Sequence, residues 1–213
     1  MIVVIGQPIL GRVDGEPIAT GSAARIALAA AARGAAVQLV GKVGEDPDGE
    51  ALVLALAQGD VGHVALLRDP AHPTPRAVAL GEDTADPEHG DAASTDSASR
   101  PALDAADVEL ALRYLTEFRV IVLADDLDEA VMRIAGDATG WSNGTLIALV
   151  ADGRGEPTGL PSDAIVLGSP PDDAEGAFDR LVGDLAAAID AGGDPQAAFR
   201  ELVGSAGWEP AAT

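Results

Sequence analysis

The sequence predicts an α/β protein, a three-layer sandwich in which a mostly parallel central sheet has helices on both faces. Short apolar runs alternate with longer segments of helical periodicity along most of the chain. Turn and cap residues separate them, as where Gly34 ends one helical segment and Asp104 precedes another. The 213 residues are enough for one domain with a substantial core. We therefore expect a single domain over residues 1–213, with right-handed crossovers between its parallel strands.

The predicted strands are short runs rich in valine, isoleucine and leucine, as expected for strands that are buried on both faces. The first run is too short for a signal peptide and lacks a basic flank, so we interpret it as a core strand. The runs are Ile2–Ile5, Val37–Val40, Val64–Leu67, Ala77–Leu80, Val120–Leu123, Leu146–Val150 and Ala164–Leu167.

The predicted helices carry apolar residues at helical spacing, as Ala24, Ala27, Leu28 and Ala31 do in the first of them. They are Ser22–Ala32, Gly49–Ala57, Ala105–Leu115, Leu127–Ala135, Ala174–Ala191 and Pro195–Leu202. Residues 82–100 are acidic, rich in small residues and without periodicity, which predicts a flexible loop. Strands and helices alternate again after this loop, so we place no domain boundary there.

Composition and charge exclude several functions. The formal net charge of −22 disfavours nucleic-acid and anionic-membrane partners, and no apolar run is long enough to span a membrane. The chain has no cysteine, which excludes disulfides and thiol chemistry. His63, His72 and His89 share no ligand spacing, so no metal site is predicted. We expect a cytoplasmic protein.

One segment has a specific signature. From Gly41 to Gly49 the chain reads GKVGEDPDG, after a helix that begins near Thr20–Gly21 and an apolar strand. This order and the pattern G-x-V-G-x-D-x-x-G resemble the ribokinase-like (PfkB) family of sugar and nucleoside kinases. Weaker matches follow in the family's order almost to the end of the chain, including the Gly193-Asp194 turn between the last two helices. The resemblance implies a ribokinase-like sandwich.

The catalytic segment departs from the family pattern. The family carries G-A-G-D at the start of a C-terminal helix, where the backbone and helix dipole receive the ATP phosphates and the aspartate acts as base. Here that helix begins DAEGAF. Alignment on Ala177–Phe178 puts Asp173 and Glu175 on the two glycines and Gly176 on the catalytic aspartate. The backbone of Gly176 and Ala177 is then what remains to bind a cofactor.

A displaced base is the alternative. Asp172, Asp173 or Asp179 could take this role, although acids in a first helical turn are ordinary cap or surface residues.

The residues at the family's substrate-binding positions also differ in this sequence. The sugar-binding aspartate of the family falls on Gly11, and its substrate-contacting asparagine falls on Arg25. By resemblance, Gly21, Ser22 and Arg25 are the candidate substrate-binding residues. Arg25 could bind a carboxylate or phosphate, or lie at the solvent edge of its helix. The chain before Gly21 is too short for the family's strand-built lid, so we expect the lid to be reduced or absent.

Two hypotheses follow. The first is a carbohydrate kinase homologue without phosphotransferase activity, which binds a small sugar-like ligand or a protein. Its basis is the joint loss of base, anion pocket, lid and sugar-binding aspartate. The family's N-x-x-E segment has no counterpart either, because the strand Asp163–Gly168 leads directly into the last helices. The second is an active kinase that uses MgATP and a relocated base. A homodimer through a sheet edge left open by the missing lid is a further option.

Overall fold

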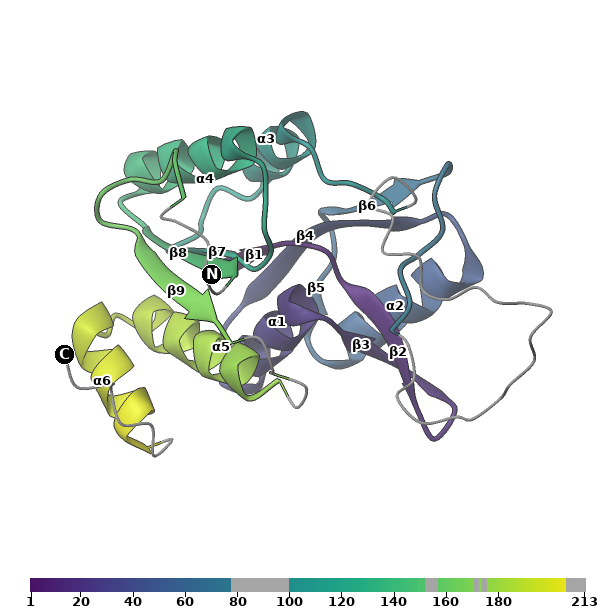
Figure 1. Ribbon diagram of the computed structural model, residues 1–213, viewed down its shortest axis with the longest axis horizontal. Coiled ribbons are helices and arrows are strands. Elements are labelled where there is room, and N and C mark those ends of the chain that lie inside the picture. The colour runs from purple at the N-terminus through teal and green to yellow at the C-terminus, as the bar shows by residue number, and fades with distance from the viewer. Residues whose placement is uncertain (78–99, 152–156, 171–172, 174–175, 206–213) are drawn as a thin grey trace.

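The computed structural model describes residues 1–77, 100–151, 157–170, 173 and 176–205. Of the predicted elements, the loop 82–100 up to residue 99 and most of the strand Ala77–Leu80 lie outside this part of the chain. The described residues form a seven-stranded parallel sheet with helices on both faces (Figure 1). The α/β fold class predicted from the sequence is confirmed.

The centre of the sheet consists of β1 (Ile2–Ile5) and β7 (Val120–Leu123), which pair in parallel and are buried at every residue. Strands buried on both faces explain why these runs have no polar alternation. The sheet order is β5-β4-β1-β7-β8-β9, with β6 also paired to β4. The remaining strands are β4 (Val37–Gly44), β5 (Val61–Gly62), β6 (Leu66–Asp69), β8 (Thr145–Ala151) and β9 (Ile165–Ser169).

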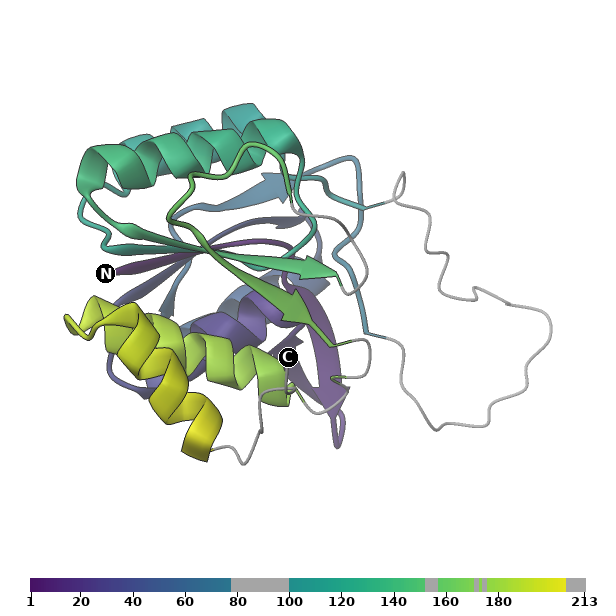
Figure 2. The same cartoon turned by 60° about the vertical axis from the view of Figure 1, so that its left-hand side comes forward.

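Two helical layers enclose the sheet (Figure 2). One contains α3 (Ala105–Tyr114) and α4 (Glu129–Ser142). The other contains α1 (Ser22–Ala32), α2 (Pro47–Gln58), α5 (Ala177–Asp190) and α6 (Pro195–Ser205). No helix in the described ranges is both long and apolar enough to cross a bilayer.

Helices α1 and α5 lie against one another because small residues line their contact. A Cβ atom at Gly183 of α5 would stand 2.6 Å from the Ala29 Cβ of α1 and 2.6 Å from the Ile26 carbonyl oxygen. Glycine therefore permits this close approach. The contact brings the N-terminal ends of both helices together at the carboxyl edge of the sheet.

A β-hairpin that the sequence analysis did not predict projects from this edge. It consists of β2 (Ile9–Val13) and β3 (Glu16–Thr20), joined by Asp14 and Gly15, which both have positive φ. Two successive residues of positive φ are typical of a type I′ hairpin turn. Leu10 also exchanges backbone hydrogen bonds with Pro75 and Ala77, so a third segment lies beside β2. The lid is thus reduced, and a small sheet remains.

Several predicted boundaries were wrong. Strand β4 continues to Gly44, and β6 begins at Leu66 because Val64 is exposed. Helix α4 does not stop at Ala135: Gly136 is buried within it, close to Pro161, and the helix ends where Asn143 adopts the left-handed conformation. Helix α5 begins at Ala177, after a left-handed Gly176.

Candidate functional site

The predicted substrate and catalytic residues meet where α1 and α5 begin, at the carboxyl edge of the sheet (Figure 1). Ser22 and Arg25 come from the first turn of α1. Asp173, Gly176 and Asp179 come from the start of α5. Asp172 and Glu175 lie outside the described residues. Ligands of open parallel sheets bind at this edge, so the location suits a binding site.

Asp173 caps α5. Its carboxylate accepts the backbone N–H of Phe178 at 3.1 Å and that of Asp179 at 3.2 Å. Gly176, the residue directly before the helix, supplies no side-chain cap and has φ of 66°. The free N–H groups of a helix start and its positive dipole end attract anions. Here a carboxylate of the chain itself occupies that position.

Asp179 lies inside the first turn of α5 with only 3% of its surface exposed. Burial raises the pKa of its carboxyl group, and the charge of Asp173 adds to this, while a hydrogen bond from Ser22 and the charge of Arg25 act in the opposite direction. One Asp179 oxygen, Oδ2, lies 3.6 Å from the Arg25 guanidinium and has no hydrogen bond. Asp179 is therefore an enclosed acid, not a surface acid.

Arg25 is in contact with the start of α5. Its side chain lies over Gly176, where a Cβ atom would come within 2.7 Å of the Arg25 Cδ. The guanidinium donates to the Asp173 carbonyl oxygen at 3.5 Å as well as pairing with Asp179. Its side chain is one-third exposed. Arg25 thus links α1 to the α5 terminus, a role that neither sequence interpretation included.

Gly21 and Ala177 contribute backbone only. Gly21 directly precedes α1 with φ of 80°, packed against Ile9 of the hairpin, and Ala177 is the exposed first residue of α5. Gly11 lies within β2, where a Cβ atom would meet Ile18 and Thr20 of β3 at 3.1 Å. A side chain at Gly11, where the sequence resemblance places the sugar-binding aspartate, would therefore collide with β3.

Sequence analysis missed Asp125, which follows β7. Its Oδ2 accepts the backbone N–H of Gln7, which follows β1. Burial raises the pKa of Asp125 to about 6, and the negative charges of Asp179 and Asp126 add to the rise. The only signal in the sequence is an acid two residues after a central buried strand, which is also a common loop pattern.

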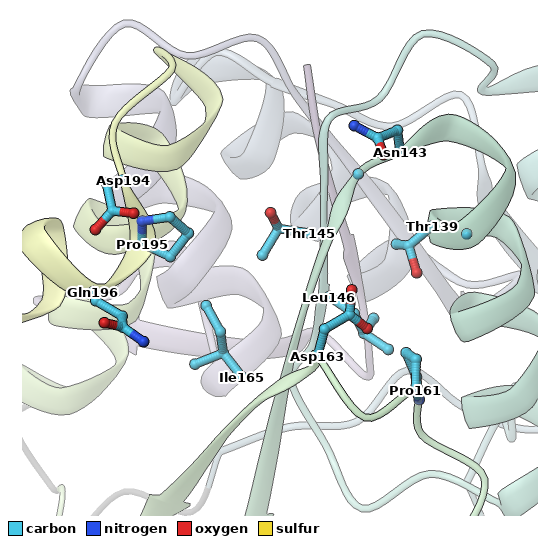
Figure 3. Close-up of a pocket in the computed structure, with 12 residues that line it drawn as sticks. Thr139, Asn143, Thr145, Leu146, Pro161, Asp163, Ile165, Asp194, Pro195 and Gln196 are labelled. Atoms are coloured by element: carbon cyan, nitrogen blue, oxygen red, sulfur yellow. The ribbon is translucent and has the colours of Figure 1, made fainter.

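A cavity of about 570 Å³ opens beside Asp125, at the ends of β7 and β8. Acidic side chains dominate its polar lining, and none of its lining residues is basic: Asp125, Asp126, Asp128 and Glu129. A second cavity, of about 510 Å³, lies at the opposite end of the sheet and contains none of the predicted site residues (Figure 3). Among the described residues, no group of three or more potential ligands could hold a metal ion.

The GKVGEDPDG segment has a structural role beside this site. Asp46 caps α2 by accepting the Gly49 N–H at 2.7 Å, and it also accepts the hydroxyl and amide of Thr74, at 2.7 and 2.8 Å. The Thr74 hydroxyl accepts the Gly44 N–H at 3.0 Å. A Cβ atom at Gly44 would lie 2.6 Å from the Thr74 amide nitrogen. This network holds the segment that pairs with β2 against the core.

No protein-family model matches the chain, and no curated protein matches its sequence. Solved structures do match. An Arabidopsis thaliana ribokinase complexed with ribose and ATP aligns with a TM-score of 0.65 and 15% identity, over 96% of this chain and 90% of that one. A ribokinase II from E. coli, in complex with ATP and Mg²⁺, gives 0.63 and 14%, over 94% and 89%. A protein called Sa239 gives 0.67 and 12%, over 99% and 95%. The chain therefore has the ribokinase-like fold.

Proposed function

We propose that this chain is a carbohydrate kinase homologue that does not transfer phosphate and instead binds a small sugar-like ligand at the carboxyl edge of its sheet. The observation that carries the proposal is the Asp173 cap. The backbone N–H groups that would receive phosphate oxygens at the start of α5 are already bonded to the Asp173 carboxylate.

The surroundings of that cap also disfavour MgATP. A phosphate at the start of α5 would lie next to Asp173 and near Asp179, and the neighbouring cavity adds further acids. At an effective dielectric constant of 20, two like charges 4 Å apart repel by about 4 kcal/mol. Among the candidate site residues at the starts of α1 and α5, only Arg25 has a basic side chain, and it is paired with Asp179. The triphosphate therefore does not fit the residues present.

A neutral polar ligand meets no such repulsion. Asp125 can present a hydrogen-bonding carboxyl group to the cavity, and Asp126 and Asp128 line it as well. Hydroxyl groups are suitable donors to carboxylates. These features support a ligand with several hydroxyl groups and no negative charge.

The second candidate function is that of an active kinase, and the position of Asp179 is the observation that favours it. A shift of three residues aligns Gly176-Ala177-Phe178-Asp179 with G-A-G-D and leaves one mismatch, Phe178 for glycine. In this register Asp179 is the base, in place of the earlier assignment to Gly176. Its position in the first turn of α5 and its raised pKa are compatible with that role.

Turnover measurements separate the two candidates. A coupled assay with MgATP and a panel of sugars and nucleosides is expected to show no transfer above background. Sustained turnover that falls by a factor of about 10² or more in Asp179→Asn would establish the active kinase instead. The matched control is Asp184→Asn, which removes a more exposed acid on the same helix, paired with Arg33.

Ligand binding is tested without nucleotide. Thermal melts with neutral sugars and polyols are expected to show a rise in Tm for the ligand that binds, since a ligand of the native state stabilises it. Asp125→Ala should abolish that rise. A rise that persists in Asp125→Ala would place the ligand elsewhere.

A further inference from the structure

The cavity of about 510 Å³ at the amino edge of the sheet has walls from four separate segments (Figure 3). Its polar lining comes from residues at the ends of these segments: Asn143 follows α4, Thr145 begins β8, Asp163 precedes β9, Asp194 precedes α6, and Gln196 lies in the first turn of α6. Open parallel sheets bind their ligands at the carboxyl edge, where the proposed function lies. The amino-edge cavity therefore has no part in that function.

Most of these polar side chains are not used within the protein. In the described part of the chain, the side chains of Asn143, Thr145, Asp163 and Gln196 make no hydrogen bond and no ion pair. Asp194 uses one oxygen, Oδ1, to accept the Ala197 N–H at 2.9 Å. Polar groups without partners that converge on one cavity are available to a ligand.

The cavity is negatively charged. Asp163 and Asp194 are the charged residues of its lining, and no lining residue is basic. The cavity also lies at the carboxyl end of α4, where the carbonyl oxygens of residues 140–142 receive no hydrogen bond from the described residues. The carboxyl end of a helix attracts cations. These features favour a positively charged ligand.

Two arginines contact segments beside the cavity, and both are directed elsewhere. Arg119, whose carbonyl oxygen accepts the Thr145 N–H, donates from its guanidinium to the Asp190 carbonyl oxygen at 3.2 Å. Arg200 donates to the Gln196 carbonyl oxygen at 3.2 Å and lines the groove between β9 and α6. Neither arginine lines the cavity or forms an ion pair with its two acids. The charges of those acids are therefore left for a ligand.

The two acids stand apart. Figure 3 shows Asp194 on the α6 side of the cavity and Asp163 on the side towards α4, with Thr145 and Ile165 between them. Among the described residues, no three acids or histidines converge as a bound metal ion would require. Two separate cationic groups suit this spacing better than one metal ion. Methylene groups that join them can pack on the apolar lining, which consists of Ile165, Leu146, Pro161 and Pro195.

We propose that this cavity binds a linear alkyl diamine, with one ammonium group at Asp194 and the other at Asp163 and the carboxyl end of α4. Ammonium groups only donate hydrogen bonds, and the two carboxylates, the carbonyl oxygens of α4 and the amide oxygens of Asn143 and Gln196 are acceptors. Hydrogen bonds between ionised groups are about twice as strong as neutral ones. The net charge of −22 adds a long-range attraction for cations.

Titration calorimetry of the full chain with 1,4-diaminobutane tests the site. At about 0.15 M salt we expect one site with a dissociation constant on the order of 0.1 mM. Binding of 1-aminobutane, which has the same carbon chain and one charge, should be at least about tenfold weaker.

Variants that remove one acid at a time locate the bound diamine. Asp163→Asn and Asp194→Asn should each weaken binding by a factor of about 3 to 10, and asparagine at position 194 preserves the helix cap. Asp137→Asn is the matched control, because it removes the same charge from an exposed acid of α4 outside the cavity, and it should leave the affinity unchanged. Absence of saturable binding, equal binding of the monoamine, or equal weakening by Asp137→Asn would overturn the proposal.

Nuclear magnetic resonance of the unmodified chain gives a test that does not depend on variants. Asn143 is the only asparagine in the sequence, so its side-chain amide signal is distinct. This signal and that of Gln196 should shift during the titration, while that of Gln7, which follows β1 at the opposite edge, should not. A shift at Gln7 without one at Asn143 would overturn the proposal. Asp125→Ala should bind the diamine as the unmodified chain does, so this site and the proposed function can fail separately.

Discussion

Asp173 illustrates how one side chain can decide what a helix start binds. Its carboxylate satisfies the N–H groups of Phe178 and Asp179, while the residue next to the helix, Gly176, has no side chain to do so. The cap stabilises α5, and in the proposed function it also occupies the position that an anion would take.

Removal of this cap should reduce stability. Loss of a helix cap typically costs about 0.5–2 kcal/mol. We expect Asp173→Ala to lower the free energy of unfolding by about 1 kcal/mol, measured by urea denaturation. Asp194→Ala, which removes the cap of α6 at the Ala197 N–H, is the matched control and should cost a similar amount. An Asp173 variant as stable as the unmodified chain would mean that the cap is absent in solution.

Asp125 should make stability depend on pH. Burial raises its pKa from 3.8 to about 6, so the folded state holds this proton more tightly than the unfolded state. Below about pH 4 the Asp125 carboxyl group is protonated in both states, so it does not lower the free energy of unfolding. As the pH rises from about 4 to about 6, the unfolded state gives up this proton while the folded state keeps it, so the folded state becomes less stable, by on the order of 2 kcal/mol in total, and above pH 6 the loss levels off.

The Asp125→Asn variant removes this titration. It should therefore be more stable than the unmodified chain at pH 7.5 and similar to it at pH 4, as measured by unfolding at both pH values. Asp128→Asn, an exposed acid of the same cavity without a side-chain cap bond, is the matched control for the change from acid to amide. An Asp125→Asn variant with the same pH profile as the unmodified chain would contradict the raised pKa.

At the scale of elements, the contact of α1 with α5 sets the geometry of the site. Gly183 allows the close approach that brings Arg25 over Gly176. A methyl group there would collide with Ala29 and the Ile26 carbonyl, so we expect Gly183→Ala to destabilise the fold by about 1–3 kcal/mol. Gly140→Ala in α4 is the control, because its Cβ would meet no atom within 4 Å. That change should be neutral or stabilising. Equal effects in urea denaturation would refute the close contact.

The strands and helices of the core could be predicted from the sequence because their apolar runs are unambiguous. The predicted bounds of β1 and β7 and of α1 match the structure residue for residue. The β2–β3 hairpin was missed, although Asp14-Gly15 between two short runs is a known hairpin signal. Those runs contain Gly11 and Pro17, which weaken a strand pattern.

The site was less accessible to sequence reasoning. Ser22, Arg25, Asp173 and Asp179 were all named beforehand, but the ion pair of Arg25 with Asp179 joins residues from opposite ends of the chain. No local pattern encodes such a contact. Asp125 was overlooked because its hydrogen bond with the backbone of Gln7 joins residues that are distant in sequence.

For the whole molecule, charge is the dominant property. With a net charge of −22, the folded state brings like charges together, and salt screens their repulsion. We expect Tm to rise by several degrees between about 10 mM and 0.2 M NaCl. Sodium and potassium chloride should act alike. A Tm that falls with added salt would show that attractive ion pairs outweigh the net repulsion.

The account depends most directly on whether the start of α5 can receive phosphate groups. Titration calorimetry of the full chain with MgATP tests this, together with Asp173→Gly and the control Asp194→Gly. We expect no binding to the unmodified chain or to the control at nucleotide concentrations up to about 1 mM, and measurable binding to Asp173→Gly. Binding of MgATP to the unmodified chain with a dissociation constant well below that concentration would contradict the account.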